Sequence, residues 1–417
     1  MSKLIIDGGR RLNGTVRISA AKNSILPIIA ASLLSSDICI LEDISLLEDV
    51  YCMGDVLKSL GADVTIDDNK IVIDPRNILY FEPPYDLVRK IRASFLVMGP
   101  LLAKMGKVKI SLPGGCNIGT RPIDLHLKGL SALGANINIG HGYVEAEASK
   151  LHGAKIYLDF PSVGATENII MASTLSEGET IIENSAEEPE IVDLANYLNS
   201  MGANIVGAGT DTIKIMGVES LKGSSHCLIP DRIEAGTFMI ACAVAGGDVR
   251  IENVIIEHVK PVIAKLTEAG VEVIEEQNSV RIISKERPKA IDIKTLPYPG
   301  FPTDLQAPMM ALLSISDGTG IITETVFENR FMHVCELNRM GANIKIDGRS
   351  AVIEGVSKLT GAMVRATDLR AGAALVIAGL IADGRTEISD VYHIDRGYVG
   401  IESKLRSVGA LIERVNS

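Results

Sequence analysis

The 417-residue sequence contains no tryptophan, and aromatic residues make up only 4% of it. Aromatic platforms that stack on bases are therefore scarce, and a formal net charge of -11 further argues against nucleic acid as a partner. No apolar run reaches the length of a membrane span, and the first residues do not read as a secretory signal. These absences predict a cytoplasmic protein that binds neither nucleic acid nor membrane.

Paired cysteines are also missing. The chain has 6 cysteines, scattered with no C-x-x-C motif, which is typical of free thiols in a reducing compartment. His126, His333 and His393 stand apart without the spacing of metal ligands. Walker and dinucleotide-binding glycine patterns are absent as well. We therefore expect no metal and no cofactor.

What the chain does contain is an internal repeat. Glycines at positions 61, 134, 202, 270, 341 and 409 each end an amphipathic helical segment and precede a β-branched strand. An Ala-rich, apolar helix and a turn come before each of these segments, so the unit reads as strand, helix, strand, helix, strand, strand. Six such units predict an α/β protein of two domains with three units each: residues 22–229, and residues 1–21 with 230–417.

The repeats allow one unit to be compared with another. Thirteen residues before each glycine, where the second helix of the unit is expected to begin, four units have Glu or Pro, which suit a helix N-terminus. The other two have Arg121 and Arg396. Lys22, Arg92 and Arg370 stand at the expected start of first helices. Cations at helix N-termini predict a bound anion, although a solvated or ion-paired arginine explains either exception taken alone.

The second unit also carries the longest loop, "SLPGGCNIGTRP" at 111–122. Glycine-bearing loops of this kind often act as lids over a site. Cys116 on this loop, close to cations, is a candidate reactive thiol, with an incidental cysteine as the alternative. In "PGFPTDLQAP", Asp304 precedes the first helix of the fifth unit. It is either a helix cap or a general base.

Long ordered stretches of the chain resemble the UDP-N-acetylglucosamine enolpyruvyl transferase family. The stretches include "ISAAKNSILPIIAASLL", "SLPGGCNIGTRPIDLH", "SVGATENIIMA", "FPTDLQA", "TETVFENRFMH" and "ATDLRAGAALV". The resemblance covers essentially the whole chain. It implies a two-domain inside-out α/β barrel of six βαβαββ units with the active site in the interdomain cleft. The implied reaction moves the enolpyruvyl group of phosphoenolpyruvate to the 3′-hydroxyl of UDP-N-acetylglucosamine, releasing phosphate, through a tetrahedral ketal. This is the first committed step of peptidoglycan synthesis.

The resemblance also implies roles for single residues. Cys116 would protonate the substrate methylene, carry a covalent adduct and be alkylated by fosfomycin, and Asp304 would take the proton of the sugar hydroxyl. Lys22 and Arg396 would be catalytic as well, and phosphoenolpyruvate would contact Lys22, Asn23, Arg121 and Arg396. The implied contacts of the nucleotide sugar are Asn23, Arg92, Arg121, Pro122, Ile123, Asp124, Leu125, Ser162, Val163, Gly164, Asp304 and Val326. Arg370 would line the site. Phe160 stands where several relatives carry a lysine, so one contact to the diphosphate is in doubt.

Two other functions remain open at this stage. A 3-phosphoshikimate 1-carboxyvinyltransferase would share the six-unit fold and phosphoenolpyruvate, but it lacks the cysteine loop and begins with a different Lys-Ser pattern. A non-catalytic paralogue that binds UDP-N-acetylglucosamine would keep the binding residues without turnover. Phosphate release with each acceptor sugar distinguishes these functions.

Overall fold

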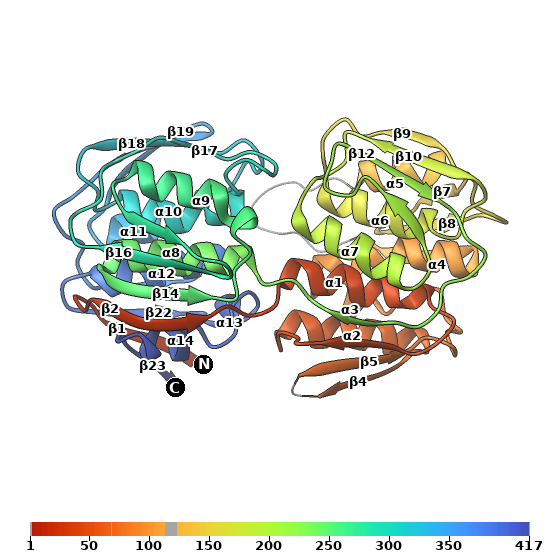
Figure 1. The fold of residues 1–417 in the computed structure, drawn as a ribbon, viewed down its shortest axis with the longest axis horizontal. Helices are drawn as coiled ribbons and strands as arrows, with labels where there is room; N and C mark the ends of the chain where they lie inside the picture. The colour runs from red at the N-terminus through yellow and green to blue at the C-terminus, as the bar shows by residue number, and fades with distance from the viewer. Residues whose placement is uncertain (1, 68, 113–122, 417) are drawn as a thin grey trace. The chain divides into compact units, whose positions relative to one another are not determined.

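A computed structural model describes residues 2–67, 69–112 and 123–416, drawn as a coloured ribbon in Figure 1. The chain divides into two compact units. Among the described residues, those from Ala20 to Ile229 form the first unit, and those up to Ser19 and from Pro230 onward form the second. Each of these two units corresponds to a domain and is built from three copies of the αβ repeat that occurs six times in the sequence.

The third repeat shows the pattern most simply. Its strands lie in the order β11-β12-β10-β9, with β9 parallel to β10 and the remaining pairs antiparallel. The helix between β10 and β11 ends next to Gly202, which has φ 106°. Only glycine adopts this left-handed conformation without strain, and it lets the chain turn directly into a strand. The repeat glycines at 61, 134, 270, 341 and 409 also have positive φ.

The first unit contains three repeats. The first comprises α1 (Lys22–Ala31), η1 (Ser32–Leu34), β3 (Cys39–Glu42), α2 (Glu48–Leu60), β4 (Asp63–Asp67), β5 (Lys70–Asp74) and the distant β13 (Ser225–Cys227). The second comprises α3 (Tyr85–Val88), η2 (Arg92–Val97), α4 (Met98–Met105), β6 (Lys107–Ser111), α5 (Asp124–Ala132), β7 (Asn136–Ile139) and β8 (Tyr143–Glu147). The third comprises β9 (Lys155–Tyr157), α6 (Val163–Ser173), β10 (Glu179–Glu183), α7 (Pro189–Ser200), β11 (Asn204–Val206) and β12 (Thr212–Met216).

The second unit contains the other three. The fourth repeat comprises β2 (Leu12–Arg17), α8 (Arg232–Ala245), β14 (Gly247–Glu252), α9 (Ile256–Glu268), β15 (Glu272–Glu275) and β16 (Ser279–Ser284). The fifth comprises β17 (Ile293–Lys294), η3 (Thr303–Leu305), α10 (Gln306–Leu313), β18 (Thr319–Thr323), α11 (Val334–Arg339), β19 (Asn343–Asp347) and β20 (Ser350–Glu354). The sixth comprises β21 (Met363–Arg365), α12 (Leu369–Ile381), β22 (Arg385–Ser389), α13 (Tyr392–Asp395), α14 (Ile401–Ser407), β23 (Leu411–Asn416) and β1 (Ser2–Asp7).

The apolar helices form the interior of each unit. In the second unit, α8, α10 and α12 pack against one another, and each also contacts strands of its own repeat. Every residue of α8 from Ile233 to Val244 is buried, as is every residue of α10. An Ala-rich helix that is apolar all round can be buried on all sides, so the sheets cover it from outside. The sequence prediction for these helices is confirmed.

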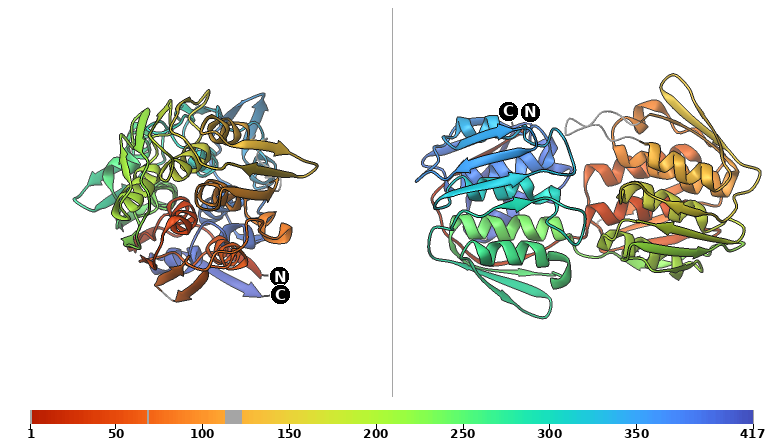
Figure 2. Two further views of the ribbon diagram at one scale, coloured as in Figure 1. Left: turned by 90° about the vertical axis from the view of Figure 1, so that its right-hand side faces the viewer. Right: turned by 90° about the horizontal axis from the view of Figure 1, so that it is seen from above.

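The ends of the chain complete two sheets of the second unit. β2 pairs parallel with β14, and β1 lies between β22 and β23, so the two termini lie side by side (Figures 1 and 2). The α/β class and the βαβαββ repeat are confirmed. Among the described residues, the second repeat forms a sheet of three strands instead of four. None of the described helices is both long and apolar enough to cross a membrane.

Candidate functional site

Lys22 is the first residue of α1, as the sequence predicts. Its side chain is 10% exposed, and its Nζ lies 2.9 Å from Oδ2 of Asp49, whose side chain is 4% exposed. Asp49 lies in the first turn of α2, where a carboxylate is also favourable for the helix dipole. Asn23 follows Lys22 and is half-buried. Asp49, which the sequence argument missed, neutralises and orients the lysine.

Two further helix N-termini of the first unit lie together. Ile123, Asp124 and Leu125 form the start of α5, and Ser162, Val163 and Gly164 form the start of α6. The two helices pack together, and a Cβ on Gly164 would come within 3.2 Å of Cε1 of His126. Ser162 caps α6, accepting a hydrogen bond from the backbone N–H of Ala165 at 3.4 Å. These predicted nucleotide-sugar residues therefore form one local cluster.

His126 lies beside these helix starts and was not assigned a role from the sequence. Burial, together with the positive charge of Arg92, lowers the pKa of His126 to about 3. Arg92 is the first residue of η2. Nδ2 of Asn168 donates to Nδ1 of His126 at 3.0 Å, and Oδ1 of Asn168 accepts from the Gly99 N–H at 2.7 Å. An amide nitrogen only donates, so the neutral ring carries its proton on Nε2.

In the second unit, Asp304 lies between two buried arginines. Nη2 of Arg330 donates to Oδ1 of Asp304 at 2.6 Å, while Nη2 and Nε of Arg370 donate to Oδ2 at 2.8 Å and 3.1 Å. The side chains of Arg330 and Arg370 are 5% and 2% exposed, and that of Asp304 is 24% exposed. The structure thus brings the predicted residues Asp304 and Arg370 together.

These contacts determine the charge of Asp304. Burial alone would raise its pKa, but the charges and hydrogen bonds of Arg370 and Arg330 lower it well below the ordinary value. Asp304 is therefore ionised at neutral pH. It does not cap the following helix: Leu305 is the N-cap residue of α10, and no side chain caps that helix. The helix-cap alternative for Asp304 is wrong.

Arg330 is also linked, through the hydroxyl of Thr303, to a second buried carboxylate, that of Glu324. Its Nη1 donates to Oγ1 of Thr303 at 2.9 Å, and that hydroxyl donates to Oε2 of Glu324 at 2.8 Å. Oε1 of Glu324 accepts from the backbone N–H of Val326 at 2.8 Å, so the predicted contact residue Val326 belongs to the same network. Glu324 and Arg330 both lie in "TETVFENRFMH", yet the repeat comparison did not single out either one.

Arg396 is found at a different helix end from the predicted one. It is the C-cap residue of α13, and α14 begins only at Ile401, after Gly400 with φ 54°. The second helix of the sixth repeat is thus divided by a glycine-containing segment, and Arg396 lies where a cation is favourable. The prediction that Arg396 opposes the helix dipole is wrong. Glu328 of the fifth repeat also lies in a turn ahead of its helix α11.

Some predicted site residues cannot be compared with the structure. Cys116, Arg121 and Pro122 lie outside the described residues. Phe160, the departure from relatives, is described and is 43% exposed just before α6. In residues 2–67, 69–112 and 123–416, no group of three His, Cys, Asp or Glu side chains could hold a metal ion.

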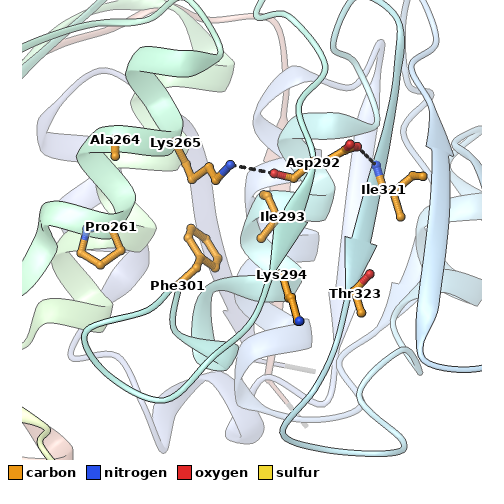
Figure 3. Close-up of a pocket in the computed structure, with 9 residues that line it drawn as sticks. All are labelled: Pro261, Ala264, Lys265, Asp292, Ile293, Lys294, Phe301, Ile321 and Thr323. Carbon is orange, nitrogen blue, oxygen red and sulfur yellow. Dashed lines mark hydrogen bonds between the residues drawn. The ribbon is translucent and has the colours of Figure 1, made fainter.

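A groove of about 580 Å³ lies elsewhere in the second unit, between α9 and the strands β17 and β18 (Figure 3). Phe301 lies in the groove, and the charged side chains of Lys265 and Asp292 both bond to backbone groups there. Nζ of Lys265 donates to the carbonyl of Asp292 at 2.8 Å, and Oδ1 of Asp292 accepts from the Ile321 N–H at 2.9 Å. None of the predicted site residues that the structure describes lines this groove.

Known proteins resemble this chain over its whole length. The family model of EPSP synthase (3-phosphoshikimate 1-carboxyvinyltransferase) matches residues 6–405. The chain is 67% identical over 413 residues to UDP-N-acetylglucosamine 1-carboxyvinyltransferase 1 of Caldanaerobacter subterraneus subsp. tengcongensis, covering 99% of both chains. It is 63% identical over 417 residues to UDP-N-acetylglucosamine 1-carboxyvinyltransferase 2 of Clostridium tetani, covering 100% of both.

Solved structures agree on the fold. The enolpyruvyl transferase NikO from Streptomyces tendae superposes with a TM-score of 0.91 at 26% identity, covering 100% of this chain and 99% of that one. An EPSP synthase from Acinetobacter baumannii superposes with a TM-score of 0.77 at 18% identity, which shows the fold alone. The chain therefore belongs to the EPSP synthase family of enolpyruvyl-transferring enzymes and, within it, to the UDP-N-acetylglucosamine 1-carboxyvinyltransferases.

Proposed function

We propose that this enzyme transfers the enolpyruvyl group of phosphoenolpyruvate to the 3′-hydroxyl of UDP-N-acetylglucosamine and releases phosphate, in the cytoplasm, as the first committed step of peptidoglycan synthesis. The observation that carries the proposal is the Asp304 carboxylate, kept ionised by two buried arginines in a chain 67% identical to a relative of that name. An ionised carboxylate is the group needed to accept a hydroxyl proton.

The proposed steps balance as an addition followed by an elimination. Asp304 takes the proton of the sugar 3′-hydroxyl, and the oxygen bonds to C2 of phosphoenolpyruvate while Cys116 gives a proton to C3. The tetrahedral ketal then loses a C3 proton, and the C2–O bond to phosphate breaks, which restores the double bond. Lys22, Asn23, Arg121 and Arg396 bind the anionic groups of phosphoenolpyruvate, so that negative charge on the departing phosphate is stabilised.

The nucleotide sugar is assigned to helix N-termini of the first unit. The N-terminal N–H groups of helices α5 and α6 suit a diphosphate, and Arg92 adds a positive charge beside them. The proposed contacts there are Ile123, Asp124, Leu125, Ser162, Val163 and Gly164, with Arg121 and Pro122. Because His126 is neutral, its Nε2–H can donate one hydrogen bond to a ligand in this region without adding charge.

The lowered pKa of Asp304 affects how it can act as the base. A carboxylate whose pKa lies well below its ordinary value accepts protons weakly. Transfer from the sugar hydroxyl therefore requires the guanidinium groups of Arg330 and Arg370 to loosen from Asp304 when both substrates are bound. A substrate anion that attracts these arginines would raise the basicity of Asp304 at the moment the hydroxyl is in place.

Phosphate release tests the proposal. The purified chain should release phosphate from phosphoenolpyruvate with UDP-N-acetylglucosamine and not with 3-phosphoshikimate, and fosfomycin should stop the reaction. Release only with 3-phosphoshikimate would favour the other carboxyvinyl transfer. Binding of UDP-N-acetylglucosamine without release would indicate a non-catalytic paralogue. Asp304→Ala should keep binding of the nucleotide sugar but lose turnover, and unimpaired turnover would remove Asp304 as the base.

A further inference from the structure

The helix that carries Lys22 and Asn23 has no cap of its own. Ala21 is the N-cap residue of α1 and makes no side-chain hydrogen bond, whereas Ser162, Asp231 and Asp368 cap α6, α8 and α12. A helix start without a cap frays more readily, because its first N–H groups lack partners. The first turn of α1 must therefore be held by other parts of the first unit.

Asp193, on α7, accepts the hydrogen bonds that fix this turn. Oγ of Ser24, the third residue of α1, donates a short hydrogen bond to Oδ2 of Asp193. The same Oδ2 accepts from the backbone N–H of Ile229 at 3.4 Å, and the Ile229 carbonyl accepts from the Ala21 N–H at 2.8 Å. Oδ2 of Asp193 thus links Ser24, in the first turn of α1, to Ile229, whose carbonyl bonds the N-cap residue Ala21.

The other oxygen of Asp193 is bound by a histidine. Nε2 of His226 lies 2.8 Å from Oδ1 of Asp193, and the side chains are 13% and 3% exposed. The His226 ring packs against Tyr197 with centroids 5.3 Å apart. A carboxylate this deeply buried is costly unless hydrogen bonds surround it, so its three donors compensate for its loss of water.

We propose that Asp193, oriented by His226, is a positioning residue for Lys22 and Asn23. Its hydrogen bonds to Ser24 and Ile229 fix the first turn of α1. They thereby fix the position of Lys22, which contacts the anionic groups of phosphoenolpyruvate. Asp49 holds Nζ of Lys22, and Asp193 holds Ser24, two residues further along the same turn. This inference rests on the function proposed above, in which Lys22 and Asn23 contact phosphoenolpyruvate.

The chain offers a matched control on the same two helices. Tyr197, one turn beyond Asp193 on α7, bonds through its hydroxyl to Oγ of Ser32 at 2.7 Å, at the far end of α1. Tyr197→Phe removes this bond and keeps the ring. It therefore weakens the same helix pair without touching the first turn of α1.

The test compares Asp193→Ala, Asp193→Asn and Ser24→Ala with Tyr197→Phe in the full-length enzyme. Asp193→Ala should raise the KM for phosphoenolpyruvate about ten-fold or more, or lower kcat to a similar extent, because small displacements of positioned groups are costly. The KM for UDP-N-acetylglucosamine should rise less than the KM for phosphoenolpyruvate, because Lys22 contacts only phosphoenolpyruvate whereas Asn23 contacts both substrates. Asp193→Asn should restore most of the activity, since its amide oxygen still accepts from Ser24 and Ile229, and Nε2 of His226 in its other tautomer accepts from the amide nitrogen.

Hydrogen exchange provides a readout that does not depend on catalysis. In Asp193→Ala, amides of the first turn of α1 should exchange faster than in the wild type, and in Tyr197→Phe they should not. Unchanged exchange together with unchanged KM and kcat in Asp193→Ala would overturn the inference, as would an equal change of KM or kcat in Tyr197→Phe. If Asp193→Ala does not fold, Ser24→Ala decides by the same measurements. Wild-type enzyme without phosphate release would refute the proposed function, while exchange would still decide whether Asp193 anchors α1.

Discussion

Replacing Arg330 by methionine tests the central electrostatic feature of the second unit. The change removes a cation that is 5% exposed and leaves Asp304 with Arg370 alone. Two hydrogen bonds disappear, one to Oδ1 of Asp304 and one to Oγ1 of Thr303. The contact of the guanidinium with the Phe327 ring, 5.2 Å from its centroid, is also lost. Methionine fills much of the vacated volume, so the loss is mainly one of charge and hydrogen bonding.

The magnitude follows from these contacts. Removing one partner of a buried ion pair costs about 3–5 kcal/mol. Asp304 keeps Arg370 and is 24% exposed, so we expect about 2–3 kcal/mol here. For a unit of this size, each kcal/mol corresponds to about 2–4 °C, which gives a Tm lowered by about 4–12 °C at pH 7. Differential scanning calorimetry or circular dichroism measures the shift.

The pH dependence provides a second check. Burial opposes ionisation of Asp304, but Arg370 and Arg330 lower its folded pKa below the unfolded value of about 4. The stability from this group is therefore present above about pH 4 and is lost as the pH falls further. Loss of Arg330 raises the folded pKa of Asp304, so the Tm difference between wild type and Arg330→Met should stay constant near neutral pH and shrink only as the pH falls below the folded pKa of Asp304 in the variant.

Arg385 provides the control, since it makes the same kind of pair with Asp7 on the surface. Arg385→Met should lower Tm far less than Arg330→Met, because exposed pairs contribute little. Equal Tm values for Arg330→Met and wild type at pH 7, or a shift as large in Arg385→Met, would refute the reasoning.

Three further predictions concern other parts of the chain. Cys116→Ser should lose most turnover and escape fosfomycin in a phosphate-release assay, while Cys52→Ser should do neither; normal turnover in Cys116→Ser would contradict an essential acid. Gly202→Ala should cost about 1–2 kcal/mol in denaturant unfolding because φ is 106° with open space around the new methyl, and an unchanged midpoint would contradict this. Burial lowers the folded pKa of His126 to about 3, so wild-type stability should fall as the pH drops below about 6.5, and His126→Gln should flatten that slope.

Much of the fold follows from local sequence signals. Each repeat glycine ends a helix because left-handed backbone favours glycine, and each Ala-rich helix is apolar all round because sheets must cover it. These signals act over a few residues, so they can be read without the tertiary structure. Helix placement failed where the second helix was short or divided, at Glu328 and Arg396. Glycines and turns inside a helical pattern shift boundaries in ways that periodicity alone does not reveal.

The partners of the charged residues were decided only by the tertiary structure. The sequence singled out Lys22, Asp304 and Arg370 as chemically important, but it did not indicate Asp49 or Arg330. It also did not indicate that Asp304, expected to be a base or a cap, lies between two arginines contributed by different repeats. The ion pair between residues 26 positions apart depends on packing within the fifth repeat, and the pair between residues 66 positions apart depends on packing between the fifth and sixth repeats. No local pattern encodes either. The chain by itself therefore determined the repeating architecture and the candidate residues, while long-range packing determined their charges and orientations.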